Sequence, residues 1–492
     1  MAVPRRTHRR RGSDPTDSAL AADLRAALAP ERVRTDRAER ALLARDASVV
    51  DVGAAGPVCF PVSTEEVAAI VGIARRHGRT VVPRGAGTGL AGGAVPLGEP
   101  IVVSLTRLDQ IEEVDHDARA VWVGAGVVNL DLTRHLRRLG YHFAPDPSSQ
   151  QVCTIGGNVA NNAGGPHCLA YGVTNAHVLA LEHVLPDGTI ARLGGLEPEP
   201  IGYDLRGVVV GGEGTLGITT RVAVRITPDP PTVRTLLLSF ERVVDAAETV
   251  SAVIAAGIVP AAMEVMDRLI TNAVEHYVHA GYPTDAAAVL LAEVDGMPAA
   301  VEASAAAIAS IGRAHGATDV RTARDDAERA LLWKGRKTAF GAIAQIAPDY
   351  YLHDTVVPRS RLAEVLEQTY RIADAHGVTV MNVFHAGDGN LHPLLLFDAR
   401  TPGILGRVHA AGAEIVRASL DAGGVLSGEH GIGLEKSEFM QLMFSDDDLD
   451  HQNRLRTAFD PDCRCNPGKV LPRGHTCADV QMLSARPDGV WL

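Results

Sequence analysis

Three glycine-dense segments in the first half of the chain restrict most strongly what it can fold into. The first comes directly after the short run Thr80-Val81-Val82 and reads Pro83-Arg84-Gly85-Ala86-Gly87-Thr88-Gly89. The second spans residues 154–165 and the third spans residues 211–217. Glycine lets the backbone approach a ligand closely, and successive N–H groups can surround an anion. The segments therefore predict a domain that holds an extended, phosphate-bearing cofactor.

The first loop differs from the two best-known phosphate-binding motifs. A Rossmann fingerprint opens a helix, and a Walker loop contains Gly-Lys followed by Ser or Thr. Here short β-branched runs follow the loop instead of a helix, and no Gly-Lys followed by Ser or Thr completes the loop. A plain glycine-rich turn would explain one such loop equally well. The recurrence in three segments favours the cofactor.

The length of the chain and its apolar spacing predict two domains. With 492 residues the chain is too long for one ordinary core. The stretch Pro228-Asp229-Pro230-Pro231 marks the expected border. Before it, the spacing predicts helices over 18–44, 63–77 and 128–139, and strands over 80–83, 101–105, 121–123, 178–185 and within 211–224.

After the border the pattern changes to β-α-β units. Strands over 236–240, 259–266, 289–294 and 317–323 alternate with helices over 243–256 and 298–315, the signature of a ferredoxin-like sandwich. A third unit has strands over 350–357 and 378–385 around a helix over 360–376. We therefore expect an α+β domain with its helices on one face of the sheet.

The charge and cysteine content exclude several classes of protein. A net charge of −12 argues against nucleic-acid binding. The basic segment from Arg5 to Arg11 lacks the apolar stretch that a twin-arginine signal needs, and no apolar run is long enough for a transmembrane helix. None of the six cysteines forms a Cys-x-x-Cys pair, which disfavours a four-cysteine metal site. Free thiols in a reducing cytoplasm are the simplest expectation.

Histidines and a glutamate in two glycine-flanked turns predict a metal site. His385 and His392 flank Asp388-Gly389, a strong hairpin signal between two apolar strands, so the two imidazoles should meet across the hairpin. A later turn, 427–433, adds Glu429 and His430. Two imidazoles and a carboxylate can hold Zn²⁺, Fe²⁺ or Mn²⁺ with positions open for a substrate. The alternative is that these are hydrogen-bonded turn residues.

In their order along the chain, the glycine segments resemble the FAD domain of the vanillyl-alcohol-oxidase / p-cresol-methylhydroxylase superfamily. That family also has the stretch Pro145-Asp146-Pro147-Ser148-Ser149. The resemblance implies a two-subdomain fold of the p-cresol-methylhydroxylase type. FAD should be non-covalent, because the loop has Thr88 and no His lies between 79 and 115. Gly212 departs from the Ser that close relatives carry. The implied cofactor-binding residues are Pro83, Arg84, Gly85, Ala86, Gly87, Thr88, Gly89, Pro147, Ser148, Thr154, Gly156, Gly157, Asn158, Ala160, Gly164, Glu213, Gly214, Ile218 and Asn466.

The second half resembles the FAD-linked D-2-hydroxyacid dehydrogenases. This resemblance implies that His385, His392 and Glu429 bind the metal and that His430 takes the hydroxyl proton. It also implies that Arg336, in Trp333-Lys334-Gly335-Arg336, holds the substrate carboxylate. Residues 392–398 resemble the glycolate oxidase D-subunit branch, alongside D-lactate dehydrogenases. Leu394 stands where enzymes for hydroxyglutarate carry Asn, which argues against a second carboxylate on the substrate.

The composition of the chain ends, the proline-rich border and the resemblance together predict how the chain is divided. We expect a disordered basic tail (1–17), an FAD domain (18–230), a substrate and metal domain (231–458), a segment returning to the FAD domain (459–472) and a tail (473–492).

The implied reaction is oxidation of glycolate or D-lactate by hydride transfer to FAD, with a quinone, a cytochrome or an iron–sulfur subunit receiving the electrons. The expected assembly is a homodimer or a hetero-oligomer, in the cytoplasm or peripheral at the inner membrane face. Three alternatives stay open: a non-catalytic FAD-holding subunit, a metal-free oxidase of an alcohol or sugar acid, and a simple metal-binding protein.

Overall fold

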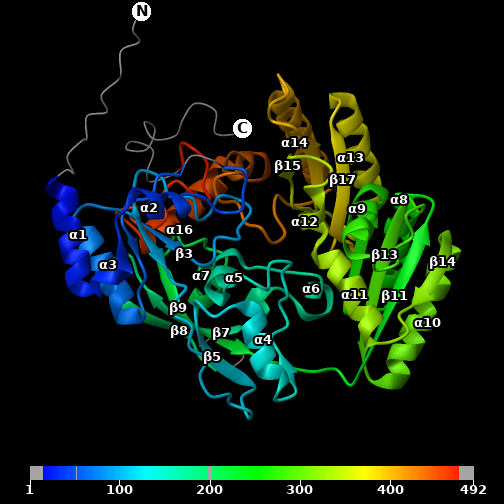
Figure 1. Ribbon diagram of the computed structural model, residues 1–492, viewed down its shortest axis with the longest axis horizontal. Helices are drawn as coiled ribbons and strands as arrows, with labels where there is room; N and C mark the ends of the chain where they lie inside the picture. Colours follow the sequence, from blue (N-terminus) through cyan, green and yellow to red (C-terminus); the bar gives the residue numbers. More distant parts are fainter. Residues whose placement is uncertain (1–14, 51–52, 197–201, 476–492) are drawn as a thin grey trace, which may run out of the picture.

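The computed structural model describes residues 15–50, 53–196 and 202–475 and places two halves of the chain side by side (Figure 1). Strands β1 to β10 form three sheets, whereas β11 to β19 belong to one large sheet. The change of sheet falls between β10 (Thr227–Pro228) and β11 (Thr232–Phe240). This is where the proline-rich stretch predicts a border.

Two small subdomains make up the first half. One contains the sheet β1-β2-β4-β3, in which β2 and β3 both run parallel to β4. The other contains the antiparallel sheet β5-β9-β7-β8. Their elements are α1 (Pro15–Ala27), β1 (Val33–Arg34), β2 (Val58–Cys59), α3 (Thr64–Arg76), β3 (Val81–Arg84), β4 (Ile101–Ser104), β5 (Ala120–Gly124), α4 (Asn129–Arg137), α5 (Ile155–Asn161), α6 (Cys168–Tyr171), β7 (Val178–Val184), β8 (Ile190–Gly194), α7 (Leu205–Val209) and β9 (Ile218–Arg225).

Local sequence signals explain where helices begin and end in this half. The helix predicted over 63–77 is confirmed as α3, where the Ser63 hydroxyl accepts a hydrogen bond from the Glu66 N–H as an N-cap. The single helix predicted over 18–44 is wrong. It is interrupted at Pro30, which cannot donate a helical hydrogen bond, and the chain forms β1 before α2 (Arg37–Leu42). Helix α1 already begins at Pro15, so residues 15–17 do not belong to the expected tail, and residues 1–14 lie outside the described residues.

The second half begins with the strand order of a ferredoxin-like sandwich. Strands β11, β12 (Ala262–Asp267), β13 (Ala288–Gly296) and β14 (Ala317–Thr322) lie in the order β14-β11-β13-β12, and all pairs are antiparallel. Helix α8 (Val243–Ala255) connects β11 to β12, and α10 (Pro298–Ala314) connects β13 to β14. On the other side of β12, β17 (Thr379–His385) extends this sheet.

Helices cover both faces of this sheet, so the expectation of one covered face is wrong. Helices α8, α10 and α13 (Leu362–His376) pack on one face. Helices α9 (Arg268–Val278), α11 (Asp326–Lys337) and α12 (Ala339–Ile343) pack on the other. The reason lies in β11, where Leu236 and Leu238 face the first layer and Leu237 faces the second. A strand that is apolar on both sides needs cover on both sides.

The third β-α-β unit differs from its prediction in one detail that matters for function. The strand predicted over 350–357 is split into β15 (Asp349–Leu352) and β16 (Thr355–Val356). Strand β15 pairs with β19 (Pro393–Phe397), whereas β16 pairs with β18 (Asn390–Leu391). The buried residues His353 and Asp354 lie at the break between them.

The end of the chain returns to the first half earlier than residue 459. The backbone N–H groups of Ile432 and Gly433 already donate to the carboxylate of Glu213, and Val81 forms a parallel bridge with Cys465 further on. Figure 1 shows α16 (Asp446–Phe459) beside the first half, after α14 (Ile404–Asp421) and α15 (Met440–Met443). Residues from both halves and from this return segment therefore meet around one region.

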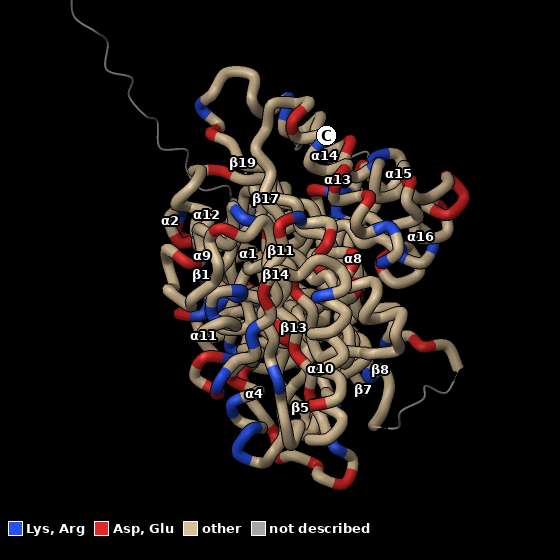
Figure 2. Tube along the Cα trace, turned by 90° about the vertical axis from the view of Figure 1, so that its right-hand side faces the viewer, with Lys and Arg blue, Asp and Glu red and all other residues tan. Residues whose placement is uncertain are grey.

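Surface and cysteine observations complete the fold. On the side seen in Figure 2, acidic and basic residues are interspersed. None of the described helices is long and apolar enough to cross a membrane.

Cys59, Cys153, Cys168 and Cys465 carry free thiols. Cys463 is disulfide-bonded, which corrects the expectation of free thiols throughout, and Cys477 lies outside the described residues.

Candidate active site

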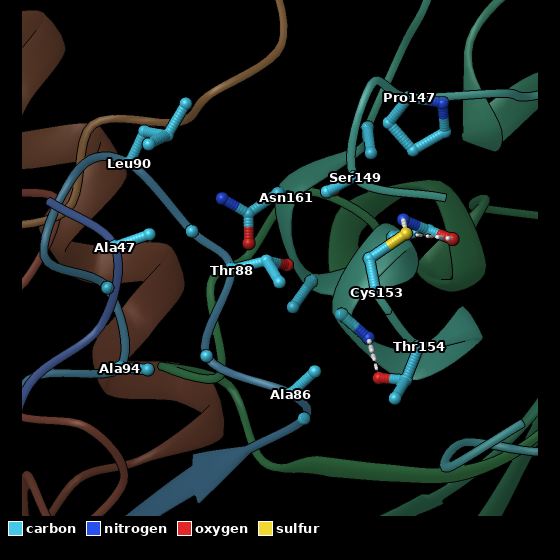
Figure 3. Close-up of a pocket in the computed structure, with 18 of the residues that line it drawn as sticks. Ala47, Ala86, Thr88, Leu90, Ala94, Pro147, Ser149, Cys153, Thr154 and Asn161 are labelled. Carbon is cyan, nitrogen blue, oxygen red and sulfur yellow. Dashed lines mark hydrogen bonds between the residues drawn. The ribbon is translucent and has the colours of Figure 1, made fainter. Parts of the chain in front are cut away.

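A cavity of about 410 Å³ lies between the glycine loop after β3 and the segment around α5. Figure 3 shows the loop residues Ala86 and Thr88 on one side and Cys153 and Thr154 on the other. Lys337 and Phe340 of the second half, and Glu429 and His430 of the later turn, also line it. Most of its wall therefore comes from the first half, and the second half supplies charged and imidazole groups.

Most of the residues predicted to bind the cofactor line this cavity. They are Pro83, Arg84, Gly85, Ala86, Gly87, Thr88, Gly89, Pro147, Ser148, Thr154, Gly156, Gly157, Asn158, Ala160, Glu213 and Gly214. The other three lie elsewhere. Ile218 lines a small adjacent cavity, Gly164 lies against Glu429, and Asn466 donates to the carbonyls of Gly93 and Glu213. Further lining residues outside the predicted set include Ala47, Leu90, Leu105, Asn161, Phe340 and Tyr350.

Several glycines of this wall are required because neighbouring atoms approach them closely. A Cβ on Gly85 would lie 2.4 Å from the Thr154 hydroxyl oxygen, and one on Gly214, at φ +71°, would lie 2.4 Å from Pro83. A Cβ on Gly157 would meet only the Thr154 hydroxyl, at 3.4 Å, among the described atoms within 4 Å. Thr154 also accepts a hydrogen bond from the Gly157 N–H, which fixes the first turn of α5 (Figure 3). The bare backbone fits a long cofactor laid against it.

The predicted hairpin brings His385 and His392 together. Their ring centroids are 5.1 Å apart, and Gly389 takes the left-handed conformation at φ +78° that the turn requires. Glu429 Oε1 lies 3.0 Å from His385 Nε2 and 3.5 Å from His392 Nε2. Burial alone would raise the pKa of Glu429, but the neighbouring imidazoles outweigh it and hold that pKa at about 2. The cluster thus combines an ionised carboxylate with two imidazoles.

Unpartnered nitrogens show that this cluster fits a metal ion. His392 is 1 % exposed, yet neither of its ring nitrogens has a hydrogen-bond partner in the part of the chain that the structure describes. An orphaned buried polar group is costly unless something binds it. The ligand atoms of His385, His392 and Glu429 lie within 4.8 Å of one another. This donor set suits Zn²⁺, Fe²⁺ or Mn²⁺.

Asp354 offers a second grouping, with His392 and His430, that overlaps the first. Its carboxylate, however, is already saturated. It accepts from the Ser427 hydroxyl at 2.5 Å and from the backbone N–H groups of residues 428–430, and it lies 3.1 Å from Lys436 Nζ. A carboxylate with that many donors has little capacity left for a metal. The first grouping, His385, His392 and Glu429, therefore keeps more of its ligand atoms available, and Asp354 shapes the 427–431 turn.

His430 lies between the cluster of His385, His392 and Glu429 and the cavity. Its ring stacks on that of His392 with centroids 4.9 Å apart and an interplanar angle of 21°. Asn161 Nδ2 donates to the His430 carbonyl at 2.7 Å and so ties the turn to the first half. Burial, together with the neighbouring His392, lowers the pKa of His430 to about 4. A neutral imidazole at the cavity wall can accept a proton.

Arg336 is a buried residue, which excludes the interpretation of it as an ordinary surface arginine. It is 1 % exposed, and its Nη2 lies 2.5 Å from Glu264 Oε2. The Nε, Nη1 and Nη2 atoms have no hydrogen-bond partner with suitable angles among the described residues. The residue does not line the cavity, whereas the next residue, Lys337, does. Arg336 thus retains donors for an anion, but behind the cavity wall.

Comparisons with known proteins agree with this architecture. The chain matches the family model described as "FAD binding domain" over residues 56–194 and the model described as "FAD linked oxidases, C-terminal domain" over residues 229–470. Glycolate oxidase subunit GlcD of Escherichia coli K12 is 44% identical over 422 residues, 86% of this chain and 85% of that protein. GlcD of Bacillus subtilis is 38% identical over 445 residues, 90% of this chain and 95% of its own length. D-lactate dehydrogenase of Anaerostipes hadrus is 33% identical over 421 residues, 83% and 88% of the two chains.

Solved structures show the same fold at low identity. The 4-ethylphenol oxidase of Gulosibacter chungangensis superposes with a TM-score of 0.79 at 19% identity, covering 94% of this chain and 99% of that one. p-Cresol methylhydroxylase superposes with a TM-score of 0.79 at 17% identity, covering 93% and 97%. The expected p-cresol-methylhydroxylase type of fold is confirmed.

Proposed function

Because the chain belongs to the family of FAD-linked oxidases, we propose that it oxidises a small 2-hydroxy acid, glycolate or D-lactate, to the corresponding 2-keto acid or glyoxylate. One observation carries the proposal: Glu429 and His430, next to the two-histidine hairpin, line the same cavity as the glycine loops. A redox cofactor and a metal would then act on one substrate. The names of the glycolate and D-lactate relatives supply the substrate class.

When bound, FAD would supply the acceptor for the hydride from the substrate Cα, and a divalent metal would supply the charge that lowers the pKa of the substrate hydroxyl. FAD would lie non-covalently against the loops, because Thr88 takes the place of a tethering histidine. Zn²⁺, Fe²⁺ or Mn²⁺ would be held by His385, His392 and Glu429. The unpartnered His392 nitrogens support that assignment.

The chain's own residues would bind the substrate and move its proton. His430, stacked on His392 at the cavity wall, takes the hydroxyl proton. Arg336 pairs with the carboxylate through guanidinium N–H donors that its ion pair with Glu264 leaves available. Lys337 lines the cavity and is the alternative cation for this role. Asp354 keeps the 427–431 turn in the shape that presents Glu429 and His430.

Electrons would leave to a separate acceptor, a quinone, a cytochrome or an iron–sulfur subunit. Two of the similar proteins are themselves named as subunits of a glycolate oxidase, which favours a partner subunit and a hetero-oligomer over a homodimer. A non-catalytic FAD-holding subunit is the rival function. The presence of the complete His385, His392, Glu429 and His430 set disfavours it. The same set disfavours a metal-free oxidase.

Turnover with a dye electron acceptor tests the proposal. Glycolate, D-lactate, L-lactate and D-2-hydroxyglutarate are supplied in turn, FAD and metal content are measured on the same sample, and peroxide is assayed in air. We expect dye reduction with glycolate or D-lactate and little peroxide. Rapid peroxide release from a metal-free sample would favour the oxidase, and FAD-loaded protein inactive with all four acids would favour the non-catalytic subunit.

A further inference from the structure

Glu264 is a fully buried carboxylate that lies in none of the sequence motifs. It lies in the middle of β12, where Ala262 and Met266 share its face of the strand and pack with α9, α11 and α12. The register of the sheet places it directly opposite His385 of β17. A carboxylate buried without charged partners would be very costly, so its surroundings must compensate its charge.

Two groups compensate it, one on each oxygen. Glu264 Oε1 lies 2.8 Å from His385 Nδ1, and Oε2 lies 2.5 Å from Arg336 Nη2. One is a metal ligand in our proposal and the other is the cation for the substrate carboxylate. A single side chain therefore connects the two parts of the proposed reaction machinery.

The contact with His385 determines which ring nitrogen can bind a metal. With a hydrogen on Nδ1 donated to Glu264, Nε2 carries the free electron pair, and Nε2 is the nitrogen that faces Glu429 at 3.0 Å. Carboxylates that accept from a metal-bound histidine fix its tautomer and ring orientation and raise its basicity. The strand register provides this contact before any ion binds.

The contact with Arg336 has a different consequence. The Arg336 guanidinium lies against one oxygen of Glu264 and compensates its buried charge, so Glu264 in turn occupies part of the positive charge that a substrate carboxylate needs. Removing the charge of Glu264 should therefore weaken the metal site and, at the same time, leave Arg336 with more of its charge for an anion.

We propose that Glu264 is a positioning residue that fixes the His385 tautomer for metal binding and moderates the anion affinity of Arg336. This rests on the proposed function, because both roles presuppose the metal and the carboxylate. A buried ion pair that only stabilised the fold would give no opposite effects on the two ligands.

Glu264→Gln tests the proposal in the FAD-loaded full chain, because it keeps the size of the side chain and removes its charge. Zn²⁺ affinity is measured by competition with a chromogenic chelator, and oxalate binding is measured on metal-free protein from the change in flavin absorbance. We expect the Zn²⁺ dissociation constant to rise about 10- to 100-fold. We expect the oxalate dissociation constant to fall several-fold in the same variant.

Asp267→Asn is the matched control. Asp267 lies on the same strand, is 3 % exposed, and accepts hydrogen bonds from the Asn382 N–H and the Tyr370 hydroxyl, away from the cluster. Asp267→Asn should lower the stability of the fold without shifting the Zn²⁺ and oxalate dissociation constants in opposite directions. If Glu264→Gln does not fold, Glu264→Asp, which keeps the charge but is too short to reach both partners, should still weaken Zn²⁺ binding.

The outcomes separate this proposal from the proposed function. Unchanged Zn²⁺ affinity in Glu264→Gln, or Zn²⁺ and oxalate both weakened together, overturns the role of Glu264 alone. An unaltered protein that turns over a 2-hydroxy acid without binding Zn²⁺, Fe²⁺ or Mn²⁺ would overturn the metal assignment and this role with it. A protein that binds Zn²⁺ as expected but oxidises none of the four acids would overturn the proposed function. The role of Glu264 would then still be judged by the Zn²⁺ and oxalate dissociation constants of Glu264→Gln.

Discussion

Lys436 Nζ lies 3.1 Å from Asp354 Oδ2, and both side chains are buried. The pair lies under the 427–431 turn, whose backbone N–H groups point to the same carboxylate. Burial would raise the pKa of Asp354, but Lys436 and the neighbouring His430 hold it well below its usual value. Asp354 therefore remains an anion around which the turn is built.

Asp354→Asn should lower the free energy of unfolding by about 3–5 kcal/mol, because it leaves the Lys436 ammonium buried without its counter-charge. Adding Lys436→Met to that variant should recover much of the stability, as measured by urea unfolding. Metal affinity should stay weak in the double variant, because the turn that presents Glu429 still lacks its anchor. Full recovery of metal binding in the double variant would show that Asp354 serves only to neutralise Lys436.

His430→Gln should slow reduction of the flavin by substrate about 10²- to 10⁴-fold, the usual contribution of a general base. FAD and metal contents should remain near those of the unaltered protein, because His430 is neither a predicted ligand nor part of the glycine loops. Stopped-flow absorbance under anaerobic conditions measures the rate. His451→Gln, at an exposed position of α16, is the control. Equal rates in the two variants would remove His430 from the mechanism.

Gly157→Leu should displace FAD. The new side chain begins at a wall position where only the Thr154 hydroxyl lies within 4 Å among the described atoms, so it extends into the cavity. Overpacking costs about 1–3 kcal/mol, which corresponds to a roughly 5- to 150-fold higher FAD dissociation constant. The flavin-to-protein absorbance ratio after purification measures the effect. Gly341→Leu, in α12 with no described atom within 4 Å of its Cβ position, should retain FAD. Full FAD content in Gly157→Leu would place the cofactor elsewhere.

His167 joins the two halves and should make their stability depend on pH. It lies between Asp146 of the first half, at 2.9 Å, and Glu293 of β13, at 3.3 Å. Burial would lower its pKa, but these two carboxylates raise it to about 10. Lys337 also contacts Asp146, and Arg329 and Trp333 contact Glu293. Because the folded-state pKa is above that of an unfolded histidine, the stabilisation is complete below about pH 6.5 and is lost as the pH rises towards 10.

The measurement is the thermal unfolding midpoint of the FAD-loaded protein between pH 6 and pH 10. The unaltered protein should lose more stability over this interval than His167→Gln, in which the titrating group is absent. Parallel curves for the two proteins would mean that His167 does not carry a raised pKa in the folded state.

Features that depend on local sequence could be predicted. The hairpin between His385 and His392 follows from Asp388-Gly389 and two apolar strands, and its strands pair as β17 and β19. The glycine loops could be recognised from the sequence because close approach of the backbone to a ligand requires glycine, whatever the surrounding fold. His385 and His392 meet because one hairpin carries both, whereas the approach of Glu429 depends on packing between two separate turns.

Features that depend on register between distant segments could not be predicted. Glu264 lies opposite His385 only because β12 pairs with β17. The two residues are 121 positions apart along the chain. Asp354 looked like part of a continuous strand, and its role appears only where β15 and β16 separate to pair with different partners. Arg336 was predicted from its motif, but its burial behind the cavity wall depends on the packing of α11.

Anaerobic bleaching of the flavin absorbance, with and without a chelator, tests most directly whether FAD and the histidine–glutamate cluster act on one substrate. Glycolate and D-lactate are added to the FAD-loaded protein, and the divalent metal is restored after chelation. Bleaching by at least one of the two acids that the chelator abolishes and the metal restores is the predicted result. Bleaching that the chelator leaves unchanged would contradict a metal-dependent mechanism, and protein that neither acid bleaches would contradict oxidation of these 2-hydroxy acids.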